Sequence, residues 1–176
     1  LELERSSVKG KQMVRDLVAK DKNLKKYIIE MQRKAYEYLP KRFVGYASKT
    51  YVADIKVSED YNTLKKTVLI VIMEEGFYGL ENIEEYHTVW KYTEQKYKER
   101  TLEDTTEIHI VELNKYEQQK EKTKQVDPWL EFFVNPYGEE VEEMARTREE
   151  LQAAVDQLNL LSADEEVRML ADAQDF

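Results

Sequence analysis

Residues 12–32, QMVRDLVAKDKNLKKYIIEMQ, carry the pattern that decides the fold of this chain. Two short runs, Val14–Val18 and Tyr27–Met31, follow the alternating apolar pattern of β-strands. Between them stands Asp21-Lys22-Asn23, a cluster of turn-forming residues. The stretch therefore predicts an antiparallel β-hairpin.

The predicted hairpin brings two carboxylates together. If the turn centres on Asn23, Asp16 and Glu30 lie directly opposite each other on one face, with Cβ atoms roughly 5 Å apart. Gln32 shares that face, because side chains alternate along a strand. The sequence thus predicts an Asp16–Glu30 pair with Gln32 beside it.

Two interpretations of this acidic pair stand side by side. Facing like charges destabilise paired strands unless something neutralises them, and Mg²⁺ prefers carboxylate oxygens. Alternatively, both acids lie on a hydrated face and repel each other weakly. Apolar residues on both faces of the hairpin, Val18 and Ile28 on one and Leu17 and Ile29 on the other, favour a covered sheet in which the acids need a partner.

A helix is predicted after the hairpin, over Tyr38–Asp54, with Pro40 in its first turn. Residues at every fourth position give it an apolar stripe: Leu39, Phe43, Ala47 and Tyr51. A more polar stripe follows the same spacing and consists of Arg42, Tyr46 and Lys49. That second stripe is either a ridge that contacts phosphates or a solvated helix face with a half-buried tyrosine.

Three further strands are predicted. Thr67–Met73, TVLIVIM, is a continuous apolar run of the length of a central strand. Glu85–Tyr92 and Thr106–Leu113 are the other two, and the charged segment Thr93–Asp104 that joins them is longer than a tight turn needs. Together with the hairpin they predict an α/β fold, a mixed sheet flanked by helices.

The chain from residue 127 onward is predicted to be a helical tail. Asp127-Pro128 opens its first helix, and two capping-box patterns, Thr147 with Glu150 and Ser162 with Glu165, predict two more helix starts. We therefore expect a core over residues 1–126 and an acidic helical tail over 127–176.

Charge separates these two parts. The chain has 27 basic and 36 acidic residues and a net charge of −9. Residues 127–176 hold 3 bases and 14 acids, which leaves 24 and 22, a net of +2, for residues 1–126. A mildly basic core is compatible with nucleic acid, whose phosphates attract Lys and Arg.

Other features narrow the class of protein. No apolar run approaches the length of a membrane span, so no membrane partner is expected. The absence of cysteine excludes disulfides and fits a reducing cytoplasm. His87 and His109 offer little material for a zinc site, and with no recognisable nucleophile or orienting acid beside them neither is assigned to the site.

The hairpin string VRDLVAKDKN with KKYIIEMQ resembles the D…E-x-Q core of the PD-(D/E)XK nucleases, in the branch of recombination-promoting nucleases and transposases. Several segments, in the same order along the chain, are similar to the same family: KRFVGYASKTY, YNTLKKTVLIVIM, TEIHIVELNKY and WLEFFV. The similarity implies a restriction-endonuclease-like sheet. It also implies that a helical segment with a further acidic metal ligand precedes the core in the family, and this segment is expected to lie outside the present sequence.

The resemblance implies a Mg²⁺-dependent DNA endonuclease. Asp16 and Glu30 would hold the ion, the main-chain carbonyl of Met31 would add a ligand, and Gln32 would take the place of the superfamily's catalytic lysine. Arg42, Tyr46 and Lys49 would contact DNA, because an R-x-x-Y pattern recurs at this place in the family. A homodimer is one oligomeric state that the chain could adopt.

Two alternatives from other classes remain. The chain could be a catalytically inactive, transposon-derived remnant that binds DNA or protein, which the neutral amide of Gln32 favours. It could also be an interaction domain whose acidic helices bind a basic partner.

Overall fold

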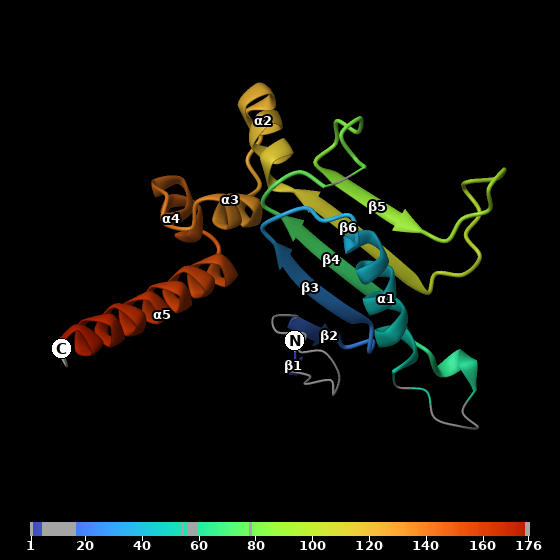
Figure 1. The fold of residues 1–176 in the computed structure, drawn as a ribbon, viewed down its shortest axis with the longest axis horizontal. Coiled ribbons are helices and arrows are strands. Elements are labelled where there is room, and N and C mark those ends of the chain that lie inside the picture. Colours follow the sequence, from blue (N-terminus) through green and yellow to red (C-terminus); the bar gives the residue numbers. More distant parts are fainter. Residues whose placement is uncertain (1, 5–16, 54, 56–59, 78, 175–176) are drawn as a thin grey trace. The chain divides into compact units, whose positions relative to one another are not determined.

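A computed structural model describes the backbone of residues 2–4, 17–53, 55, 60–77 and 79–174 (Figure 1). The chain divides into two compact units, residues 1–122 and residues 123–176. Each unit is described separately below.

The first unit is built on a mixed sheet, which in the described residues has six strands in the order β1-β2-β3-β4-β6-β5. Their bounds are Glu2–Glu4 (β1), Leu17–Lys20 (β2), Lys26–Gln32 (β3), Thr67–Met73 (β4), His87–Lys91 (β5) and Thr106–Glu112 (β6). β3, β4 and β6 run parallel, and β1, β2 and β5 pair antiparallel with their neighbours. The predicted α/β fold with a mixed sheet is confirmed.

The hairpin of β2 and β3 is present in the predicted register. Leu17 pairs with Ile29 and Val18 with Ile28, as a turn centred on Asn23 requires. The carboxylate of Asp21 closes the turn by accepting hydrogen bonds from the backbone N–H groups of Asn23 (2.8 Å) and Lys25 (3.0 Å). Hairpin and register are thus confirmed from residue 17 onward, and Asp16 lies outside the described residues.

Helix α1, Leu39–Val52, covers one face of β3, β4 and β6 (Figure 1). Leu39, Phe43 and Ala47 of the predicted stripe are fully buried, whereas Tyr51 is half-buried. The helix packs on the apolar face of the central strands, and the buried members of this core are Ile28, Leu39, Phe43, Ala47, Leu69, Val71, Met73, Phe77, Leu80 and Ile110. The predicted helix and its core stripe are confirmed.

A short 3-10 turn, η1 (Tyr61–Thr63), precedes β4, and helix α2, Leu113–Thr123, continues directly from β6. Tyr116 of α2 is buried and packs edge-on against Tyr86, with ring centroids 5.5 Å apart. Aromatic packing of this kind fixes the first turns of α2 next to the segment that leads into β5.

The second unit consists of helices α3 (Pro128–Val134), α4 (Glu139–Ala145) and α5 (Glu149–Gln174). α3 begins at Pro128, as the prediction that Asp127-Pro128 opens the tail implies. Asp127 caps the helix, because its carboxylate accepts hydrogen bonds from the backbone N–H groups of Trp129 and Leu130, each 3.0 Å long. A small core joins α4 to α5 through Val141, Ala145, Leu151 and Val155.

The helix start predicted at Ser162 is wrong. α5 passes through this position without interruption, and its sequence contains neither glycine nor proline. Strong helix formers on both sides let the backbone hydrogen bonds continue. The Ser162 hydroxyl instead hydrogen-bonds the phenol of Tyr137, 2.6 Å away. The helix start predicted at Thr147 agrees with the structure to within two residues, because α5 begins at Glu149, and the Thr147 hydroxyl donates to the carbonyl of Met144.

None of the helices in the described ranges is both long enough and apolar enough to cross a lipid bilayer.

The sheet face opposite α1 carries an ion-pair network centred on Glu107. Its carboxylate contacts Lys66 Nζ (2.6 Å), Lys91 Nζ (2.8 Å) and His109 Nε2 (2.6 Å), and Lys66 also contacts Asp104 (2.6 Å). Burial by itself would raise the pKa of Glu107, but the hydrogen bonds from Lys66, Lys91 and His109 outweigh burial and lower this pKa to about 2. The network therefore joins the start of β4 to β5 and β6.

His109 extends this network to His87 on β5. The two rings stack with centroids 5.1 Å apart, and His87 Nε2 lies 2.8 Å from His109 Nδ1. Burial and then the neighbouring His109 lower the pKa of His87. The orienting acid that was not recognisable in the sequence is Glu107.

Glu107 makes the stability of the first unit depend on pH. A carboxyl group whose pKa is lower in the folded than in the unfolded state stabilises the fold above its unfolded value, here 4.5, and this contribution is lost as the pH falls towards 2. We expect Glu107→Gln to cost more free energy of unfolding at pH 6 than at pH 3, by roughly 2 kcal/mol. Urea denaturation at the two pH values measures it, with Glu103→Gln as an exposed control; an equal cost at both would contradict the assignment.

Candidate active site

Glu30 is the buried acid at the centre of the site. Side chains alternate along β3, so Lys26, Ile28 and Glu30 face α1 and are buried, while Met31 faces away and is 54% exposed. The Glu30 side chain is only 2% exposed. A carboxylate removed from water to this degree needs charged or hydrogen-bonding neighbours.

Two such neighbours converge on the same oxygen of Glu30. The amide nitrogen of Gln32, two residues further along the same face, donates to Glu30 Oε1 over 2.5 Å. The guanidinium of Arg42 forms an ion pair with that oxygen through Nη2. Arg42 reaches it because α1 packs Leu39 and Phe43 into the sheet core and so holds the intervening turn against β3.

Tyr46 positions Arg42. Its hydroxyl accepts a hydrogen bond from Arg42 Nε, 2.6 Å long, and the guanidinium carbon lies 5.0 Å from the centre of the tyrosine ring. The two residues are four apart in α1, which places them on adjacent turns of one face. Tyr46, Arg42, Glu30 and Gln32 thus form a continuous chain of polar contacts from the helix to the strand.

The structure brings some of the predicted site residues together and leaves others apart. Glu30, Gln32, Arg42 and Tyr46 come together, whereas Lys49 is exposed on α1. Met31 lies on β3 between Glu30 and Gln32, with its side chain on the opposite face. Asp16 is outside the described residues.

Glu112 is a second buried carboxylate on the α1 face, and the sequence predicted no functional role for it. Gln32, Met73 and Glu112 are aligned across β3, β4 and β6, so Glu112 lies two strand spacings, roughly 10 Å, from Gln32. Its side chain is 2% exposed, and it accepts a hydrogen bond from the backbone N–H of Phe77 (2.7 Å) and pairs with Lys115 (2.6 Å). It anchors the segment after β4. The alternation of side chains along β6, which places Glu112 on the same face as Ile108 and Ile110, could have predicted its burial.

The donor chemistry around Glu30 suits a hard divalent cation. Its carboxylate and the amide oxygen of Gln32 are oxygen donors of the kind that Mg²⁺ prefers. Within the described part of the chain, however, no three histidine, cysteine or acidic side chains converge on one position. Asp16, which the sequence predicts as a second metal-binding carboxylate, lies outside that part of the chain.

Comparison with known proteins identifies one family. The family model described as PD-(D/E)XK nuclease family transposase matches residues 1–175. Neither the curated proteins nor the solved structures include a significant match. Nucleases with the PD-(D/E)XK core generally use a divalent metal.

The ion pair of Glu30 and Arg42 is expected to dominate the local energetics. Removing one partner of a buried pair leaves the other charge uncompensated, so Arg42→Ala should lower the free energy of unfolding by roughly 3 kcal/mol. Adding Glu30→Gln should restore most of this loss, because the buried group is then neutral. Urea denaturation of the four proteins in this double-mutant cycle measures both effects, and a loss below roughly 0.5 kcal/mol in Arg42→Ala would contradict the buried pair.

Proposed function

The chain belongs to the PD-(D/E)XK nuclease family transposases, and from this membership and the contacts around Glu30 we propose that it is a Mg²⁺-dependent DNA endonuclease that promotes recombination. One observation supports the proposal most strongly. Glu30, the acid of the E-x-Q triplet, is buried, and its carboxylate is contacted by the Gln32 amide and the Arg42 guanidinium.

Glu30 is proposed as the acid that holds the metal. Asp16, which lies outside the described residues, is the proposed second carboxylate. The observed pairing of Leu17 with Ile29 supports this choice, because Asp16 precedes Leu17 in the sequence and Glu30 follows Ile29. The carbonyl of Met31 is the proposed third ligand. When bound, the ion lowers the pKa of a coordinated water and offsets charge on the scissile phosphate.

Arg42 is proposed to supply part of the positive charge that the catalytic lysine supplies elsewhere in the superfamily. Gln32 carries no charge and can only orient and hydrogen-bond. The guanidinium of Arg42 lies against the same carboxylate oxygen as the amide of Gln32, and its side chain is 29% exposed. It is therefore close enough to Glu30 to contribute positive charge beside the reacting phosphate while it holds the carboxylate in place.

DNA is the proposed partner, and Lys49 is the proposed phosphate contact on α1. Lys49 is exposed on the helix that supplies Arg42 and Tyr46. Arg42 and Tyr46 were expected to contact DNA directly, but their contacts with each other and with Glu30 favour a positioning role. Weak contacts of single lysines to phosphate are additive in their effect on salt dependence.

One observation favours the second candidate, a catalytically inactive protein that binds DNA. Arg42 already neutralises Glu30 within the protein, and a carboxylate in such a pair is a poorer ligand for a cation. Cleavage assays separate the two candidates.

Cleavage of DNA by the full chain tests the proposal. We expect nicking of a supercoiled plasmid in Mg²⁺ that stops in EDTA, a loss of roughly hundredfold or more in Glu30→Gln, and a loss of roughly 10- to 100-fold in Arg42→Ala, because Arg42 supports the metal-binding acid. The readout is the rate of conversion of supercoiled to open-circular DNA.

Glu74→Gln is the matched control. Glu74 is an exposed acid that follows β4 at the same edge of the sheet and pairs with Arg33 over 2.9 Å. Its substitution should leave the rate unchanged. A wild-type rate in Glu30→Gln would reject the assigned site, and DNA binding without any cleavage by the wild-type chain would favour the inactive binder.

A further inference from the structure

Residues 92–104, in the segment between β5 and β6, form an arm that does not contribute to the candidate active site. Figure 1 shows it continuing beyond the ends of both strands. Thr93 and Thr101 form an antiparallel bridge, the N–H of Glu94 donates to the carbonyl of Arg100 (2.8 Å), and the N–H of Leu102 donates to the carbonyl of Tyr92 (3.1 Å). The arm is therefore a hairpin with its own hydrogen-bond ladder.

Glu94 fixes the tip of the arm. Its carboxylate accepts hydrogen bonds from the backbone N–H groups of Lys96 (2.7 Å) and Tyr97. Tyr97 in turn lies under two cations, with Lys96 Nζ 5.6 Å and the Arg100 guanidinium carbon 5.7 Å from its ring centre. A tip held in this way can bind a partner with little loss of conformational entropy.

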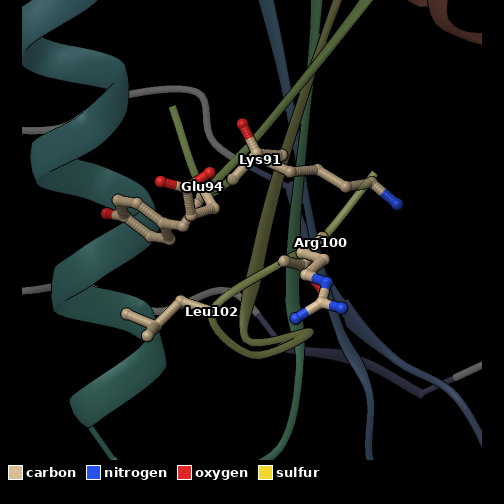
Figure 2. Close-up of a pocket in the computed structure, with 7 residues that line it drawn as sticks. Lys91, Glu94, Arg100 and Leu102 are labelled. Atoms are coloured by element: carbon tan, nitrogen blue, oxygen red, sulfur yellow. The ribbon is translucent and has the colours of Figure 1, made fainter. Parts of the chain in front are cut away.

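Large apolar and aromatic side chains are exposed along the arm and the adjoining strand. Their exposed fractions are 46% for Trp90, 49% for Tyr92, 50% for Tyr97 and 87% for Leu102. The inner side of the arm borders an open hollow of about 610 Å³. In Figure 2 the nitrogen ends of Lys91 and Arg100 lie on one side of the hollow, and Glu94 and Leu102 lie on the other.

The charged side chains of the arm indicate which kind of partner it could bind. Of the acids in and near the arm, Glu94 is engaged by backbone N–H groups and Asp104 by Lys66. The exposed cations Lys96 and Arg100 lie over the Tyr97 ring and Lys98 follows that residue in the sequence, while two exposed acids remain in the arm, Glu99 and Glu103. Cations interleaved with exposed rings match a strand of nucleic acid whose phosphates meet the cations and whose bases stack on the rings.

We propose that the arm binds an unpaired segment of DNA through stacking on Tyr97 and Tyr92 and phosphate contacts to Lys96, Lys98 and Arg100. Duplex DNA fits less well, because its stacked bases would leave these rings in water, and three cations beside the exposed acids Glu99 and Glu103 attract its phosphates only weakly. The inference rests on the proposed function in that it names the form of the DNA substrate.

The position of the arm sets the length of DNA required. The arm precedes β6, whereas Glu30 and Gln32 lie towards the far ends of the parallel strands. Seven residues of β6 span roughly 23 Å. The DNA must therefore extend over roughly 20 Å or more to reach both the arm and the proposed position of cleavage.

The test measures binding of the full chain to a fluorescent 20-nucleotide oligothymidine and to a 20-base-pair duplex, by anisotropy in EDTA so that no cleavage occurs. We expect tighter binding to oligothymidine than to the duplex, and roughly tenfold weaker oligothymidine binding in Tyr97→Ala. Tyr97→Phe should bind like the wild type, since stacking does not need the hydroxyl. Arg100→Gln should reduce the slope of log affinity against log salt by about 0.7.

Control variants separate this inference from the proposed nuclease. Tyr61→Ala and Lys22→Gln change an exposed tyrosine and an exposed lysine outside the arm and should bind like the wild type. Binding to oligothymidine in EDTA does not require cleavage, so failure of the nuclease assignment leaves this result intact. Absence of oligothymidine binding, equal binding by Tyr97→Ala and wild type, or a change in self-association alone would overturn the proposal.

Discussion

The ion pair between Glu30 and Arg42 is the interaction on which the site depends. α1 buries Glu30 when it packs on the sheet, and the same helix supplies the guanidinium that makes this burial tolerable. Leu39 and Phe43 set the position of the helix, and Arg42 lies on the turn between them. Packing and site chemistry are therefore not separable here, because displacement of α1 would leave a carboxylate buried without its cation.

Local patterns in the sequence were sufficient for most of the first unit. Alternation and the Asp21–Asn23 turn predicted the β2–β3 register, and four-residue spacing predicted the buried stripe of α1. These features depend on neighbours within a few residues, which is the range over which sequence patterns carry structural information. The prediction failed at Ser162, where a capping pattern occurs inside a run of strong helix formers and its hydroxyl bonds Tyr137 instead.

The contacts that define the site were harder to predict because they join distant residues. The sequence placed Arg42 and Tyr46 on one face of a helix, and it proposed that this face contacts phosphates. It did not show that α1 would turn Arg42 towards β3, since this depends on how the helix packs across the sheet. The same limit applies to Glu107, which orients His109 through an ion-pair network drawn from β5, β6 and the segments before β4 and β6.

For the proposed binding of DNA, the engagement of Arg42 changes which side chains can supply the affinity. A guanidinium that is committed to a buried carboxylate has fewer donors for a phosphate, and Tyr46 occupies a further one through its hydroxyl. The exposed cations of the first unit are dispersed, and they include Lys34 after β3, Lys49 on α1, and Lys96, Lys98 and Arg100 in the arm. Dispersed cations steer and weakly hold a polyanion but do not fix its register. The exposed aromatic rings of the arm add a contact that depends on whether the bases of the DNA are free to stack. The arm is therefore a stronger candidate than α1 alone for distinguishing unpaired from duplex DNA.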